Sequence, residues 1–129
     1  MIEWARSEIS VETNASGLHP FVPSGSDYAE ALRFFEAIGF TKVWGDDEYA
    51  GLRYGAAYFI LQNIDVPVWQ SNQMVVLEVD DLDQYWAELS ELNLPDSFPG
   101  VKTKEPTDYP WGRELHIIDP AGVCWHVRQ

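Results

Sequence analysis

The residues best suited to chemistry lie near one end of the sequence: His116, Cys124 and His126. Imidazoles bind metal ions or transfer protons near neutral pH. The two histidines flank an Asp-Pro-Ala-Gly turn at 119–122, so we predict that they meet on adjacent antiparallel strands. A two-histidine metal site without a carboxylate is incomplete. We therefore expect His116 and His126 to be hydrogen-bonding residues that face a cavity.

Cys124 has one basic neighbour, His126, on the same face of the predicted strand. A reactive thiol needs a lowered pKa, which nearby positive charge provides. The sequence offers little such charge here, so a buried structural cysteine is the favoured interpretation.

Trp111 lies between Pro110 and Gly112 in the segment PWGRE, which also contains Arg113, a further candidate ligand-binding residue. The flanking residues keep this tryptophan out of a regular strand interior. It is therefore either a ligand-contacting residue, which we favour, or a core residue.

One structural unit occurs twice in the chain. Apolar residues recur at helical spacing in two segments, 26–40 and 80–94, and five of them are offset by 54 positions. Asp27 or Ser26 is expected to cap the first helix. The paired positions are Tyr28 and Leu82, Ala31 and Tyr85, Leu32 and Trp86, Phe35 and Leu89, and Ile38 and Leu92.

Short strand-like runs surround both helices and predict an α+β fold of two tandem βαβββ modules. We expect one half-open curved mixed sheet around a groove, with the helices on its outer face. Residues 1–129 would form a single domain: an extension at 1–18 (strand or short helix), a first module at 19–62, a linker at 63–72 and a second module at 73–129. Pro99 and Pro106 restrict any strand near them to a sheet edge.

The chain has 21 acidic and 8 basic side chains, a formal net charge of −13. This charge argues against nucleic acid or an anionic membrane as a partner and is compatible with a cationic one. The lone cysteine fits a reducing compartment, and no secretory signal or membrane span is visible, so we expect a cytoplasmic protein.

Three segments carry a resemblance to a known family: WGDDEYAG (44–51), LDQYWAE (82–88) and PWGRELHIIDPAGVCWHV (110–127). With the paired modules, they resemble the vicinal-oxygen-chelate superfamily of glyoxalases, dioxygenases and bleomycin-resistance proteins. The last segment is most similar to the bleomycin-resistance proteins, which are acidic, non-catalytic dimers that sequester a cationic glycopeptide drug.

The resemblance implies a ligand groove at a homodimer interface. Aromatic wall positions of that family fall on Trp44, Tyr49 and Trp111, where flat rings would stack. A cationic tail would meet the acidic residues that follow Trp44, which include Asp46 and Asp47. Two further positions hold Val76 and Glu78, so we expect a wider or differently shaped groove.

The enzymes of the superfamily hold a divalent metal ion with ligands from both modules. Their ligand positions fall here near Pro20, beside His19, and on Met74 and His126. This set is poor, so we expect no metal, no cofactor and no catalytic residue. The sequence favours a drug-sequestering protein over two alternatives: a metal-dependent lyase, transferase or dioxygenase, and a metabolite-binding module without a resistance role.

Overall fold

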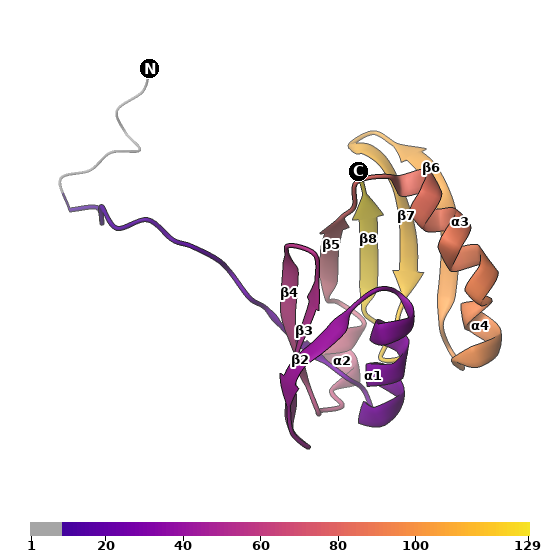
Figure 1. Ribbon diagram of the computed structural model, residues 1–129, viewed down its shortest axis with the longest axis horizontal. Helices are drawn as coiled ribbons and strands as arrows, with labels where there is room; N and C mark the ends of the chain where they lie inside the picture. The colour runs from indigo at the N-terminus through magenta and orange to yellow at the C-terminus, as the bar shows by residue number, and fades with distance from the viewer. Residues whose placement is uncertain (1–8) are drawn as a thin grey trace.

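The computed structural model describes residues 9–129 and contains two four-stranded sheets, with strand orders β1-β4-β3-β2 and β5-β8-β7-β6 (Figure 1). The sheets lie side by side, and the helices α1 and α3 pack on them. The first module comprises β1 (Phe21–Pro23), α1 (Tyr28–Ala37), β2 (Thr41–Gly45), β3 (Tyr49–Tyr54) and β4 (Ala57–Gln62). After α2 (Pro67–Gln70) come β5 (Met74–Glu78), α3 (Leu82–Leu92), α4 (Leu94–Ser97), β6 (Lys102–Tyr109), β7 (Gly112–Ile118) and β8 (Cys124–Arg128).

Each sheet is mixed, because its first strand pairs in parallel with its last strand while the other neighbours are antiparallel. The parallel pairs are β1 with β4 and β5 with β8. The predicted α+β class and the repeated βαβββ order are confirmed. Each module supplies one of the two four-stranded sheets.

Both long helices begin at an aspartate N-cap, and the two caps are 54 positions apart in the sequence. The side chains of Asp27 and Asp81 each accept a hydrogen bond from the backbone N–H three residues later. The predicted apolar faces are buried for most of their length, at Ala31 and Phe35 in α1 and at Leu82, Tyr85 and Leu89 in α3. Leu92, predicted to share that face, is instead exposed, because α3 ends there before a left-handed Asn93.

Aromatic rings join the two modules. Trp125 of β8 lies with its ring centroid 5.3 Å from that of Phe35 and 5.2 Å from that of Phe59, both in the first module. Across the same boundary, the Tyr85 hydroxyl donates a 2.6 Å hydrogen bond to the Ile38 carbonyl. This packing fixes the relative position of the sheets and accounts for much of the aromatic content.

The outer edge strands β2 and β6 are both irregular. Their registers shift between Lys42 and Trp44 and between Lys104 and Thr107, respectively. The second shift spans Pro106, whose missing N–H interrupts the ladder. The prediction that the prolines confine this strand to an edge is confirmed for Pro106.

Residues 9–20 contain no helix or strand. The segment before residue 16 extends away from the sheets (Figure 1), whereas residues 16–20 lie against them. The part of the predicted extension before residue 9 lies outside the described residues. Within 9–129, every helix is too short or too polar to cross a membrane.

Candidate functional site

The second sheet has one face covered by helices and one open face. Side chains alternate along β7 and β8, so that Leu115, Ile117, Trp125 and Val127 are buried on the helix side. The open face carries the polar partners in cross-strand rows. One row contains Val76, His126 and His116, and the next contains Glu78, Arg128 and Glu114. Four of the predicted site residues, Val76, Glu78, His116 and His126, therefore lie together.

Glu114 organises this face, although the sequence analysis did not single it out. Its side chain is 1% exposed, and its Oε1 lies 2.7 Å from His126 Nδ1 and 3.0 Å from His116 Nε2. Arg128 Nη2 donates a 2.7 Å hydrogen bond to Oε2. The prediction that the two histidines meet on adjacent strands and form hydrogen bonds is confirmed, and the structure adds a carboxylate between them.

The ionisation of Glu114 follows from these contacts. Burial alone would raise its pKa, but the hydrogen bonds from His126, His116, Trp111 and Arg128 outweigh burial and lower the pKa to about 2. Glu114 is therefore a carboxylate at neutral pH.

Trp111 is 61% exposed, yet its ring is held in place. It stacks on Tyr109 with a centroid separation of 4.9 Å and an interplanar angle of 5°, and Tyr109 in turn stacks on His116 at 5.3 Å. The indole Nε1 donates a 3.1 Å hydrogen bond to Glu114 Oε1. An exposed, pre-ordered aromatic face of this kind can stack on a flat ligand without losing side-chain entropy.

Arg113 lies apart from this group. Its guanidinium forms a 2.8 Å ion pair with Asp83 of α3, so it points to the helix side of the sheet.

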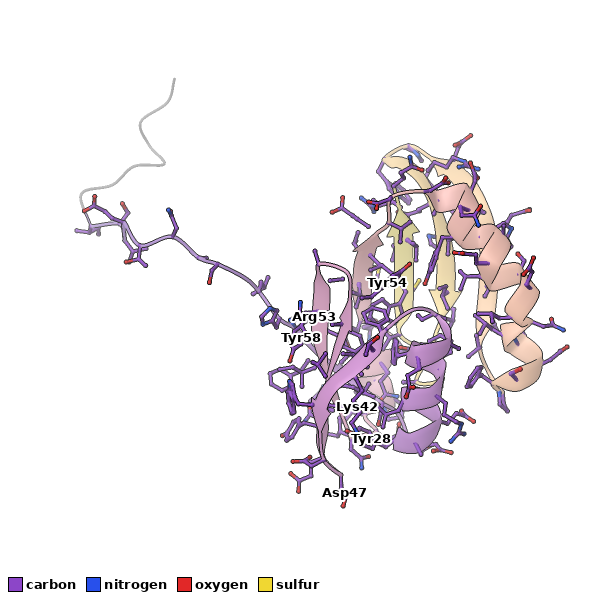
Figure 2. All side chains as sticks on the ribbon, in the orientation of Figure 1. Tyr28, Lys42, Asp47, Arg53, Tyr54 and Tyr58 are labelled. Atoms are coloured by element: carbon purple, nitrogen blue, oxygen red, sulfur yellow. The ribbon has the colours of Figure 1, made fainter. Side chains whose placement is uncertain are left out.

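The first sheet carries a second aromatic group on its open face. Trp44 of β2 donates a hydrogen bond from Nε1 to the Tyr58 hydroxyl of β4, above Gly51 of the intervening strand. Any larger residue at position 51 would collide with both side chains. Arg53 lies 4.8 Å from the Tyr58 ring centroid, and Figure 2 shows these two residues together on neighbouring strands.

A cavity of about 540 Å³ connects the two sheets, a volume typical of small-molecule sites. The first module lines it with His19, Arg53 and Tyr58, and the second module lines it with Val76 and Trp125. Trp44 donates a hydrogen bond to Tyr58, which lines the cavity, and His126 is the cross-strand partner of Val76, which also lines it. Trp44, His116 and His126 are not themselves among the lining residues.

The acidic hairpin lies elsewhere. Asp46 Oδ1 accepts hydrogen bonds from the backbone N–H groups of Glu48 and Tyr49, which lower its pKa and close the turn between β2 and β3. Asp47 projects at the lower tip of the first module in Figure 2, whereas the β6–β7 hairpin with Trp111 is at the upper end in Figure 1. Tyr49 lies near this lower end and packs against Phe21 with centroids 5.9 Å apart. One chain therefore does not bring Asp46, Asp47 and Tyr49 to Trp111.

The metal positions expected from the resemblance do not form a set. Pro20 offers no donor, and His19 packs against the Tyr58 ring with centroids 4.5 Å apart. Met74 is 70% exposed and offers only a soft thioether. Of these positions, His126 alone belongs to a group of ligand-type side chains.

Cys124 lies next to this group on the open face but is not activated. Burial raises the pKa of its thiol, and the negative charges of Glu114 and Asp119 raise it further. The prediction of a structural cysteine is consistent with this environment.

No protein-family model matches the chain, and no curated protein matches its sequence. Solved structures do match its fold. A bleomycin-binding protein from bleomycin-producing Streptomyces verticillus, complexed with copper(II)-bleomycin, has a TM-score of 0.77 and 25% identity, over 91% of this chain and 98% of that chain. A bleomycin-binding protein complexed with bleomycin has a TM-score of 0.75 and 21% identity, over 88% and 97%.

A member of the glyoxalase/bleomycin resistance protein/dioxygenase superfamily from Sphaerobacter thermophilus also matches, with a TM-score of 0.62 and 21% identity over 88% of this chain and 98% of that chain. The resemblance predicted from the sequence is thus confirmed at the level of the fold. The chain has the fold that bleomycin-binding proteins share with this superfamily.

Proposed function

We propose that this protein binds a flat, partly aromatic, cationic small molecule of the bleomycin type and acts by sequestering it. The observation that carries the proposal is Trp111, an exposed indole fixed by the Tyr109 ring on one side and by Glu114 through its Nε1. A solvent-exposed ring held this firmly is suited to stacking on a ligand. Two proteins with the same fold, by their descriptions, bind bleomycin.

The cavity between the sheets supports the same proposal. It is large enough for part of a drug-sized molecule and is lined by Tyr58 from one module and Val76 from the other. Trp44 donates a hydrogen bond to Tyr58, one of the lining residues. The net charge of −13 would attract a cationic ligand from solution.

We further propose that the working unit is a homodimer. The β6–β7 hairpin, which contains Trp111, and the acidic hairpin with Asp47 lie at opposite ends of the folded molecule, so we expect that a single copy does not place both against one ligand. A two-fold pairing would present the same surfaces twice and so create two equivalent sites. Sedimentation at tens of micromolar should give a dimer, and a monomer would contradict this part of the proposal.

The decisive experiment is a calorimetric titration with metal-free bleomycin at about 50 mM salt, in parallel with Trp fluorescence. Saturable binding at one ligand per chain, lost or weakened in Trp111→Ala, would support sequestration. Absence of binding by bleomycin, together with binding of an unrelated cationic aromatic metabolite, would favour the metabolite-binding alternative. Time-resolved chromatography of the ligand should show that it leaves the protein chemically unchanged.

A further inference from the structure

We infer that Glu114, His116 and His126 form a binding site for one divalent transition-metal ion, in addition to the proposed drug site. Three ligand-type side chains converge there, and their ligand atoms all lie within 4.8 Å of one another. Within residues 9–129 this is the one such group of histidine, cysteine and carboxylate ligands that the fold assembles.

The separations suit an ion. Glu114 Oε1 lies 2.7 Å from His126 Nδ1 and 3.0 Å from His116 Nε2. A metal about 2.1 Å from each of two ligand atoms holds them about 3.0 Å apart at a right angle. Small side-chain shifts would therefore place an ion among the three atoms.

The backbone fixes the three side chains independently of any ion. His116 and His126 are direct cross-strand partners on β7 and β8, and Glu114 lies two residues before His116 on the same face. The histidine rings meet at a centroid distance of 4.5 Å. Because ligands on rigid strands need little rearrangement, the site is largely preorganised.

Neighbouring groups orient the ligands in the way that outer residues of metal sites do. Arg128 binds Glu114 Oε2, and Oε1 contacts both histidines and accepts a hydrogen bond from Trp111 Nε1. The Tyr109 ring stacks on His116 and limits its rotation. His126 Nε2 is buried and has no hydrogen-bond partner among residues 9–129, whereas Nδ1 of the same ring contacts Glu114.

The chemistry of the donors selects the class of ion. Two imidazoles and one carboxylate suit Zn²⁺, Ni²⁺, Cu²⁺ or Fe²⁺, whereas Mg²⁺ and Ca²⁺ prefer oxygen ligands. This set differs from the positions considered in the sequence, because Glu114 and His116 come from β7 and only His126 is shared. The expectation of no metal came from Pro20 and Met74 at the family's ligand positions, which this site does not use. The two histidines alone were judged incomplete for lack of a carboxylate, and Glu114 is such a carboxylate.

The test uses the untagged, full-length protein after dialysis against a chelator, with no drug present. Titration with Co²⁺ should saturate at one ion per chain and give visible d–d absorption of a site with nitrogen ligands. His116→Gln and His126→Gln should each weaken Co²⁺ binding at least ten-fold. The matched control is His19→Gln, at the third histidine of the chain. This variant should change the affinity for Co²⁺ less than two-fold.

A second measurement keeps the inference testable if a variant fails to fold. Electron paramagnetic resonance of the parent protein with one equivalent of Cu²⁺ should show coupling to two imidazole nitrogens. Coupling to one imidazole nitrogen or none, no saturation up to 1 mM Co²⁺, or an affinity for Co²⁺ in both histidine variants equal to that of the parent protein would overturn the site. Because no drug takes part, these outcomes are separate from success or failure of drug binding.

Discussion

Trp111 Nε1 lies 3.1 Å from Glu114 Oε1 and donates a hydrogen bond to it, so an indole that is 61% exposed is attached to a carboxylate that is 1% exposed. The same oxygen contacts both histidines of the open face. A ligand that stacks on Trp111 would therefore touch a ring whose orientation is set by the buried cluster.

Trp111→Ala should weaken binding of metal-free bleomycin by at least ~1 kcal/mol, about five-fold, at every ionic strength, because contact and desolvation are insensitive to salt. Trp111→Phe should retain most of the affinity, since it keeps a ring on Tyr109 but loses the bond to Glu114. Trp69→Ala, which removes an exposed indole from α2, is the control. Calorimetry at 0.05 and 1 M salt measures all three. Unchanged binding by a folded Trp111→Ala protein would show that Trp111 has a structural role and does not contact the ligand.

Asp47→Asn should reduce affinity for the same ligand two- to three-fold at 0.05 M salt and have no effect at 1 M, where the Debye length is about 3 Å. The side chain is exposed at the hairpin tip, so folding should be unaffected. Asp46→Ala should behave differently and lower the urea midpoint of unfolding, because it removes two hydrogen bonds that close the turn. Equal salt dependence in the parent and Asp47→Asn would exclude Asp47 from steering.

Gly51→Ala should displace the Trp44 indole and break its hydrogen bond to Tyr58, because the added Cβ overlaps both side chains. We expect a loss of about 1–3 kcal/mol in the free energy of unfolding, typical of overpacking. Gly17→Ala is the control, since its added Cβ meets only the His19 side chain. Urea denaturation gives the stability, and Trp fluorescence reports the displaced ring. A stable variant with parental fluorescence would contradict the packing described here.

Asp119→Ala should cost about 2–4 kcal/mol of stability. Its carboxylate accepts hydrogen bonds from the backbone N–H groups of Ala121 and Val123 and from Trp125 Nε1, and the change leaves buried donors unpaired. Asp108→Ala, at an exposed position, should change stability by less than 0.5 kcal/mol. Thermal and urea unfolding of both variants decide the point. Comparable losses of stability in the two variants would mean that the hydrogen bonds to Asp119 contribute little to the stability of the fold.

Glu114→Gln should flatten the loss of stability in acid. The pKa of Glu114 is about 2 in the folded protein and ordinarily 4.5, so its stabilisation is present above about pH 4.5 and is lost as pH falls toward 2. Asp119 acts in the opposite direction: burial raises its pKa to about 6, so its contribution is present in acid and is lost as pH rises through 6. Urea midpoints of the parent and variant between pH 2 and 7 isolate the Glu114 effect. Parallel curves of urea midpoint against pH for the parent and the variant would contradict this contribution of Glu114.

The sequence predicted the fold because local signals repeat at a fixed offset. The capping residues Asp27 and Asp81 and the apolar helix faces recur together, and each unit supplies strands in the same order. Division into two sheets was not predictable, since strand periodicity says nothing of whether β1 and β5 pair with each other. The separation of Asp47 from Trp111 was not predictable either, because it depends on how the two sheets are placed relative to each other.

Glu114 was missed because it was considered only as part of a motif. Its position two residues before His116 on a predicted strand places both on one face, and the turn at 119–122 brings His126 opposite His116. That spacing alone could have shown a carboxylate between two imidazoles. Its near-complete burial and the bond from Arg128 depend on the packed sheet and are visible only in the structure.

The bulges in the outer strands have a consequence for behaviour at high concentration. A straight, regular edge strand offers unpaired N–H and C=O groups that recruit strands from other molecules and lead to fibrils. Here the registers of β2 and β6 shift at these edges, lysines lie along both, and Pro106 removes a donor from one. Copies of this chain should therefore resist strand-by-strand stacking at these edges, so that its exposed aromatic rings do not lead to amyloid-like aggregation.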